Sequence, residues 1–210
     1  MSRAPAASFS HPQTNQDMAH LRKALETSLA PLEHVLPDQA GHRRLLNLAC
    51  GRADETGVLA DLFRPRDQSL EIIGADLRAP EIDAARVRWM AAPGSGVRTS
   101  FHAGDGLAFL DGLPSTDEFD IAFLRHQNFW NGAELWQGMF DRSLHRLSDH
   151  GLLVITSYFD LEHELACRAL QQLGARLVSN HKNTNSRRLP DAPGKSVDRH
   201  VAVFRKPPSA

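Results

Sequence analysis

The chain has 210 residues, of which 41% are hydrophobic and 23% charged, as expected for one folded domain with a full core. Its net charge of −1 gives no overall attraction to nucleic acid or to an anionic membrane. Two cysteines make no disulfide framework, no apolar run reaches the ~18 residues of a membrane helix, and the N-terminus lacks a signal-peptide pattern. These features exclude membrane-spanning and disulfide-stapled classes, and they predict a cytoplasmic protein.

The N-terminal region divides into a tail and a helix. Residues 1–14 show no periodic pattern, and we expect a mobile tail. Asn15 or Asp17 is expected to cap a helix, and Pro31 to interrupt it. Four apolar residues share one face of that helix: Met18, Leu21, Leu25 and Leu29. The segment 15–42 is therefore predicted to pack on the main domain, either as a structural helix or over its ligand face.

A strand, a tight turn and a helix follow, and the rest of the chain is arranged around them. Residues 45–49 form an apolar run typical of a buried strand, and small residues dominate 50–53. Asp54 is expected to cap the next helix. The negative charge of Glu55 is favourable near the positive N-terminus of that helix. This geometry aims free backbone N–H groups beyond the end of the strand, where a ligand is expected. The alternative is an ordinary turn of an α/β protein.

Further strands and helices alternate along the chain. Strands are predicted at 70–77, 97–103, 119–124, 152–156, 175–179 and 200–204, and helices at 80–90, 107–110, 133–147 and 160–173. Gly151 is expected to mark a turn, and Asp160 to cap a helix. The alternation predicts an α/β fold with a mostly parallel sheet and helices on both faces. In such sheets, ligands bind beyond the carboxyl ends of the strands.

Two aspartates are predicted at that edge. Asp76 at the end of the second strand is suited either to capping a helix or to accepting hydrogen bonds from a ribose diol. Asp105, between two glycines, is either a turn residue or an acceptor for an adenine amino group. Together with the small-residue turn, they indicate an adenosine-containing ligand.

At these segments the chain resembles the class I S-adenosylmethionine-dependent methyltransferases. The signatures are Leu45–Ala53 for the first strand and turn, Ile72–Asp76 for the ribose-binding strand, His102–Gly106 for the adenine-side turn and Phe119–Phe123 for the fourth strand. The resemblance covers residues 43–206. It implies a doubly wound, seven-stranded, mostly parallel sheet with a C-terminal antiparallel hairpin, in three α/β/α layers.

The resemblance also implies a cofactor, S-adenosylmethionine, and a set of residues to hold it. The predicted cofactor-binding residues are Asn47, Ala49, Cys50, Gly51, Arg52, Asp76, Leu77, Asp105, Gly106 and Arg125. Asn47 stands where the family has an acid, and Ala49 and Ala53 stand where it has glycines. Because alanine is strained at positive φ, the turn is expected to adopt other angles. Arg52 either reaches the methionine carboxylate or is a solvated surface residue.

Residues after the fourth strand are candidates for substrate chemistry. His126 is a candidate general base, with a purely structural histidine as the alternative. Asn128 is expected to bind a carbonyl or amide of the substrate. The Asn/Asp-Pro-Pro-Tyr/Phe pattern for methylation of base amino groups is absent from the sequence.

The C-terminal stretch bears on the methyl acceptor. Residues 176–206 carry eight Lys/Arg and two Asp, a local net charge of +6 that leaves −7 for the rest. Arg187 and Arg188 are predicted to bind a small or modestly anionic acceptor. The alternatives are an RNA substrate, a solvated loop, or a non-catalytic binding module that keeps the fold. The acceptor atom and the oligomeric state do not follow from the sequence.

Other chemistries have weaker support. His163 and Cys167 lie four apart on a predicted helix, but no third ligand has matching spacing. We therefore expect a surface histidine, a buried cysteine and no metal. A dehydrogenase would require a Gly-x-Gly-x-x-Gly turn after the first strand, and the sequence lacks it.

Overall fold

A computed structural model of the chain describes residues 12–32, 42–65, 68–90 and 96–206. The helices are α1 (Pro12–Leu29), η1 (Ala30–Leu32), α2 (Thr56–Phe63), α3 (Ala79–Arg88), α4 (Gly106–Gly112), η2 (Phe129–Asn131), α5 (Ala133–His145) and α6 (Asp160–Gln172). The strands are β1 (His42–Leu48), β2 (Ser69–Asp76), β3 (Val97–Ala103), β4 (Phe119–Arg125), β5 (Leu147–Ser157), β6 (Arg176–Lys182) and β7 (His200–Arg205).

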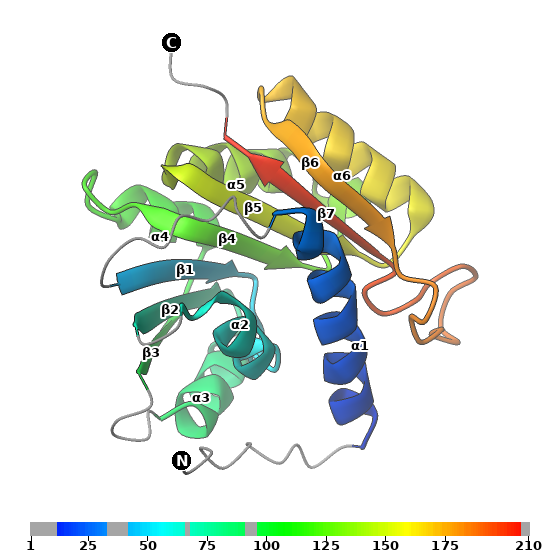
Figure 1. Ribbon diagram of the computed structural model, residues 1–210, viewed down its shortest axis with the longest axis horizontal. Coiled ribbons are helices and arrows are strands. Elements are labelled where there is room, and N and C mark those ends of the chain that lie inside the picture. The colour runs from blue at the N-terminus through cyan, green and yellow to red at the C-terminus, as the bar shows by residue number, and fades with distance from the viewer. Residues whose placement is uncertain (1–11, 33–41, 66–67, 91–95, 207–210) are drawn as a thin grey trace.

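These strands form one sheet in the order β3-β2-β1-β4-β5-β7-β6 (Figure 1). β1 pairs in parallel with β2 on one side and with β4 on the other. The order in which consecutive strands are added to the sheet therefore reverses between β1 and β4. β7 is antiparallel to both of its neighbours, β5 and β6. The predicted fold class is confirmed: a doubly wound, mostly parallel seven-stranded sheet that ends in an antiparallel hairpin.

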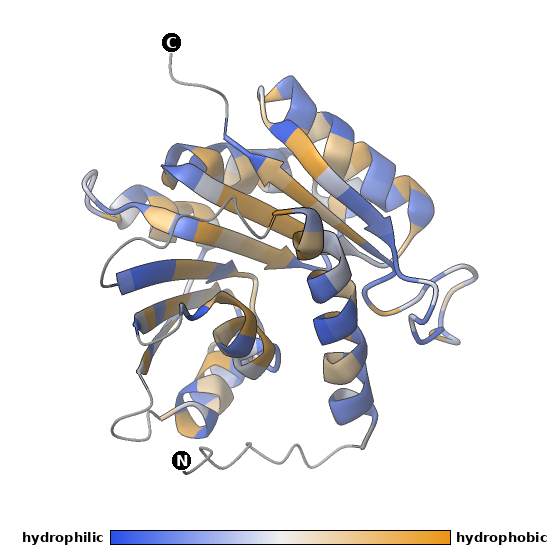
Figure 2. Ribbon diagram, viewed as in Figure 1, coloured by the Kyte–Doolittle hydropathy of each residue, from blue (hydrophilic) through white to orange (hydrophobic). Residues whose placement is uncertain are grey.

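Helices cover both faces of the sheet. On one face, α1 and α2 bury apolar side chains such as Leu21, Leu25 and Leu59 against the central strands. On the other face, α4, α5 and α6 pack a second apolar cluster that includes Phe140 and Leu170. Figure 2 shows the central strands mostly hydrophobic and the outer surface of α1 mostly hydrophilic. The sheet therefore lies between two apolar layers, and its carboxyl edge remains available for a site.

The start of α1 differs from the prediction. The helix begins at Pro12, so Asn15 and Asp17 lie inside it rather than at its cap. Proline is well suited to a first helical turn because it lacks an N–H that would have no partner there. Pro31 does interrupt the helix, which continues only as the short η1. The remainder of the predicted tail, 1–11, and residues 33–41 lie outside the described residues.

Three other local predictions were wrong. Gly151 was expected in a turn but lies within β5. A Cβ at this position would lie 3.0 Å from the Phe119 carbonyl oxygen, so the close approach of β4 is what requires a glycine here. Glu55 is the N-cap of α2, but its side chain makes no capping hydrogen bond, while Asp54 pairs with Arg88. Phe159 is the N-cap of α6, and Asp160 lies in its first turn.

Candidate functional site

The turn after β1 keeps a left-handed backbone at alanine. Ala49 and Ala53 both have φ of 52°, and Gly51 has φ of 53°. The expectation that the alanines would adopt other angles was therefore wrong. A left-handed alanine costs roughly 1–2 kcal/mol, so the surrounding structure must impose this conformation.

Contacts on both sides hold the turn in place. The Cys50 N–H donates to the Ala75 carbonyl at 3.2 Å, and Trp89 Nε1 donates to the Ala53 carbonyl at 2.9 Å. Cys50 is buried in a small cluster with Phe101 and Ala53, and burial raises the pKa of its thiol well above the usual range. Gly74 permits this packing, since a Cβ there would lie 3.0 Å from Cys50 Sγ. The Cys50 side chain is therefore part of the core beneath the turn.

Asp76 connects the turn to the end of β2. Its Oδ2 accepts from the Gly51 N–H at 2.8 Å, and its Oδ1 accepts from the Arg78 N–H at 2.9 Å. The Arg78 guanidinium also covers the carboxylate, with Nε 3.0 Å from Oδ1 and Nη2 3.2 Å from Oδ2. Despite burial, these donors hold the pKa of Asp76 below its usual range. Both oxygens thus already have two donors.

The other predicted cofactor residues of this half of the edge lie around Asp76. Asp105 is the N-cap of α4, and its Oδ1 accepts from the Ala108 N–H at 2.8 Å. Gly106 follows it in the first turn of α4, close to Met139. Leu77 is an exposed apolar side chain, 74% accessible. Arg52 is exposed, and its Nε lies 3.8 Å from Glu81 Oε2.

Asn47 and Glu55 form a buried pair at the start of the turn. Asn47 Nδ2 donates to Glu55 Oε1 at 2.6 Å, while Asn47 Oδ1 is buried without a partner in the described residues. Burial raises the pKa of Glu55, although Arg125 lies 3.5 Å away and opposes this effect. Glu55 thus places a carboxylate directly beside Asn47. Sequence reasoning missed this contact, although Glu55 stands only eight residues after Asn47.

Arg125, at the end of β4, is enclosed by acids. Its Nε and Nη2 donate to the two Asp198 oxygens at 2.9 and 2.6 Å. Asp198 also accepts from the Thr156 hydroxyl at 2.8 Å, and it is only 1% exposed. These partners lower the pKa of Asp198 despite its burial. Arg125 therefore closes a buried network at the carboxyl edge, and Asp198 was not foreseen because it stands 73 residues further along the chain.

His126 faces the same aspartate. Its Nε2 lies 2.8 Å from Asp198 Oδ1, and its ring stacks on Tyr158 with centroids 3.8 Å apart. Desolvation lowers the pKa of His126, with Asp198 acting in the opposite direction. A neutral imidazole is the form that can accept a proton, so the predicted base role stays a prediction.

Backbone strain gathers at this edge. Within the described ranges, the non-glycine residues with positive φ are Ala49, Ala53, His126 and Asp198. They follow β1 and β4 or precede β7. All therefore lie near the point between β1 and β4 where the order of the strands in the sheet reverses. Residues with a strained backbone cluster at ligand sites, where the surrounding contacts hold them in that conformation. The arrangement indicates a binding site at the carboxyl edge.

The basic loop between β6 and β7 is largely paired. Arg187 donates to both Asp17 oxygens, at 2.8 and 2.6 Å, and so connects this loop to α1. Arg199 pairs with Asp160, and Lys195 with Asp191. Arg188 is exposed, and its backbone pairs with Ser196. The predicted substrate roles of Arg187 and Arg188 stay predictions, with the Arg187 charge already compensated.

His163 was predicted at the surface, and this was wrong. Its ring is 3% exposed, with Nδ1 3.1 Å from the Ser157 hydroxyl and Nε2 2.9 Å from Asn180 Oδ1. Cys167 is buried as predicted, with Sγ 3.4 Å from His163 Nε2. No group of three or more His, Cys, Asp or Glu side chains in the described part of the chain is placed to hold a metal.

We expect the stability to fall as the pH drops from 6.5 to 4. Burial lowers the pKa of His163 to about 4, whereas an unfolded histidine titrates near 6.5. Between these values the unfolded chain binds a proton that the folded chain does not, so acid favours unfolding by roughly 3 kcal/mol at pH 4. Urea unfolding at several pH values measures this loss. His163→Gln should flatten the slope and His145→Gln, on an exposed ring, should not; equal slopes in all three proteins would contradict the prediction.

Comparisons with known proteins identify the fold. No protein-family model matches the chain, and no curated protein matches it. A solved S-adenosylmethionine-dependent methyltransferase from Clostridium acetobutylicum is similar with a TM-score of 0.62 at 10% identity, over 90% of this chain and 92% of that one. The glycopeptide N-methyltransferase MtfA, complexed with sinefungin, gives 0.60 at 11% identity, over 89% and 85%. A precorrin 8w decarboxylase from Methanobacterium thermoautotrophicum gives 0.56 at 16% identity, over 88% and 87%.

The chain therefore has the class I S-adenosylmethionine-dependent methyltransferase fold. The decarboxylase shows that proteins named for different reactions share this architecture. The function must be argued from the site. Among the helices described here, none has the length and apolar character needed to cross a bilayer.

Proposed function

We propose that this chain is a cytoplasmic S-adenosylmethionine-dependent methyltransferase that acts on a small acceptor. The observation that carries the proposal is the left-handed turn after β1, whose Gly51 N–H is bonded to Asp76 at the end of β2. Two strained alanines retain this turn where glycine would adopt it without strain. A turn that has this conformation is well suited to close approach of a ligand to its backbone.

The residues at the edge fit the proposed cofactor. Asp76 would hold the ribose diol, and Asp105 with Leu77 would flank the adenine. The buried Asn47 carbonyl oxygen lacks a donor among the described residues, and it suits the ammonium of the methionine portion. The cofactor supplies a methyl group on a sulfonium. The chain's own task is to orient the acceptor, exclude water and accept a proton, for which His126 remains the candidate.

Pairing in the basic loop favours a small acceptor over RNA. Nucleic-acid affinity would depend on free cations that neutralise phosphates. Arg187, Lys195 and Arg199 instead form ion pairs with this chain's own carboxylates. The same pairing weakens the case for an anionic acceptor. A small size of the acceptor is therefore better supported than a negative charge on it.

A non-catalytic binding module is the second candidate, because Arg78 covers the carboxylate that would hold the ribose. Isothermal titration with S-adenosylmethionine and S-adenosylhomocysteine separates the two. We expect both to bind the wild-type chain with micromolar dissociation constants. Absence of heat with either ligand, in a protein shown to be folded by circular dichroism, would reject the enzyme and leave the module.

A further inference from the structure

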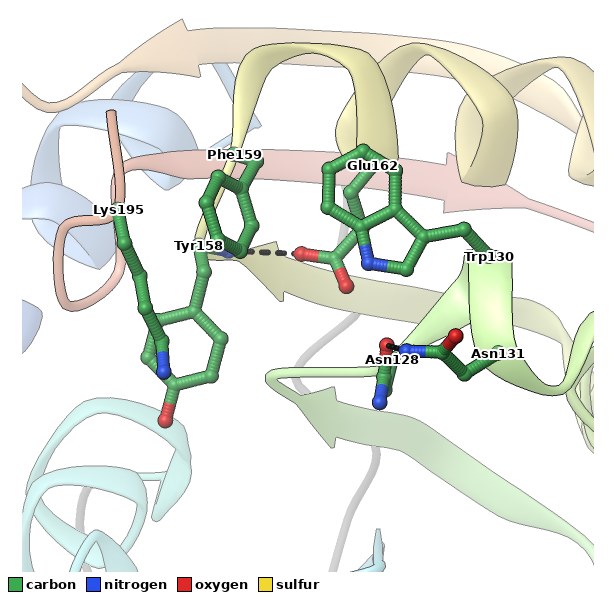
Figure 3. A pocket seen from close by; sticks show the side chains of 7 residues that line it. All are labelled: Asn128, Trp130, Asn131, Tyr158, Phe159, Glu162 and Lys195. Carbon is green, nitrogen blue, oxygen red and sulfur yellow. Dashed lines mark hydrogen bonds between the residues drawn. The ribbon is translucent and has the colours of Figure 1, made fainter. Parts of the chain in front are cut away.

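A cavity of about 290 Å³ lies beside the candidate site (Figure 3). Its walls come from the segment after β4, the segment after β5, the start of α6 and the loop before β7. The lining residues are Asn128, Trp130, Asn131, Tyr158, Phe159, Glu162 and Lys195. This position is at the carboxyl edge of the sheet, where an acceptor would meet the proposed cofactor. The volume suits a small molecule rather than a polymer.

Three aromatic side chains line the cavity: Trp130, Tyr158 and Phe159. Trp130 and Phe159 lie with ring centroids 5.0 Å apart at 59°, and Tyr158 lies on the other side of the cavity (Figure 3). Ring faces carry negative electrostatic potential and attract cations within about 6 Å. This chain already uses that attraction, since Lys195 Nζ lies 4.9 Å from the Tyr158 ring centroid.

A buried carboxylate stands between the rings. Glu162 is 1% exposed, and its Oε2 accepts from the Tyr158 N–H at 3.1 Å. In Figure 3 its carboxylate points between Trp130 and Tyr158, towards the amides of Asn128 and Asn131. Burial raises the pKa of Glu162, with backbone donors opposing this effect. Lys195, the cation among the lining residues, acts on Glu162 only through space, while its ammonium is paired with Asp191 at 2.6 Å.

We propose that this cavity is a subsite for a small organic ammonium group, held by Glu162 and by the rings of Trp130 and Phe159, since His126 and Lys195 already cover the Tyr158 ring. Rings and a carboxylate together select a cation that is both apolar and able to donate hydrogen bonds. An anion would face Glu162 at close range, and a neutral ligand would forgo both attractions. We further infer that the methyl acceptor carries this ammonium group, a step that rests on the proposed function.

The test uses three probes of matched size: benzylammonium, benzyl alcohol and benzoate, titrated into the full chain by calorimetry at pH 7. We expect benzylammonium to bind at least tenfold more tightly than either of the other probes. Glu162→Gln should lose at least tenfold in affinity, because the amide keeps an acceptor for the Tyr158 N–H but not the charge. Glu164→Gln, which removes an exposed carboxylate from the same helix, is the matched control and should bind as wild type does.

Preference for benzoate, absence of benzylammonium binding, or equal affinity in wild type and Glu162→Gln would overturn the subsite. The same samples are titrated with S-adenosylhomocysteine. If the ammonium probe binds and the cofactor product does not, the subsite stands and the acceptor inference falls together with the proposed methyltransferase. If the cofactor product binds and the ammonium probe does not, the proposed function stands and the subsite falls.

Discussion

Replacing Asp76 with alanine is expected to weaken S-adenosylhomocysteine binding by about a hundredfold. The proposed ribose contacts are two hydrogen bonds to a charged acceptor, together worth roughly 3 kcal/mol or more. The carboxylate also holds the Gly51 N–H, so its loss would relax the turn as well. Isothermal titration measures the change. Asp83→Ala, at an exposed carboxylate paired with Arg86 on α3, is the control and should leave affinity unchanged.

Arg78→Ala should act in the opposite direction. Removing the guanidinium takes away one of the two donors of each Asp76 oxygen and opens a position for a ligand, while the backbone donors remain. The pair is exposed on the arginine side, with the Arg78 side chain 61% accessible. Such a pair is worth about 1 kcal/mol or less, so affinity should tighten by up to about fivefold. If Arg78→Ala weakened binding instead, Arg78 would be a ligand contact rather than a competitor for Asp76.

Asp198→Asn is expected to destabilise the fold by about 3 to 5 kcal/mol, because it leaves the Arg125 guanidinium buried without its bidentate partner. Among the described residues, Glu55 is then the remaining acid paired with Arg125, with Oε2 3.5 Å from Nη1, and burial disfavours its charge. Urea unfolding at pH 7 provides the measurement. The Asp198 pKa is depressed by folding, so this contribution is present above about pH 4 and is lost as the pH falls below that value.

The matched control is Asp191→Asn. Asp191 pairs with Lys195 at 2.6 Å, but it is largely exposed, so its removal should leave the unfolding free energy close to that of the wild type. Equal effects of the two substitutions would contradict the importance assigned to the buried network.

The sheet was predictable because its signals are local. β3 matches the predicted bounds, and apolar runs fixed the position of β1 and β4 within a few residues. Helix ends were less predictable, because any of several polar residues can cap a helix. Asn15, Asp17 and Asp54 are each suited to that role, and tertiary packing placed the boundaries elsewhere.

The site was predictable only in outline. The Gly51–Asp76 connection follows from strand order, since β1 and β2 are neighbours. Asp198 and Glu162 carry no comparable signal, because one follows a long loop and the other resembles any acid in a first helical turn. Side chains that meet across 73 residues, as Arg125 and Asp198 do, depend on the finished topology rather than on local pattern.

The ion pair between Arg187 and Asp17 joins residues that are 170 positions apart. α1 packs on β6 and β7, which come after the other described strands in the sequence, and also on α2. During synthesis, the part of the α1 surface that packs on β6 and β7 therefore has no native partner until those strands have been made, although α2 can cover the neighbouring part earlier. Contacts of such long sequence separation also slow folding, because a large loop must close before they form. Complete docking of α1 should thus be a late step in folding, and the apolar side chains that β6 and β7 cover should stay exposed until then.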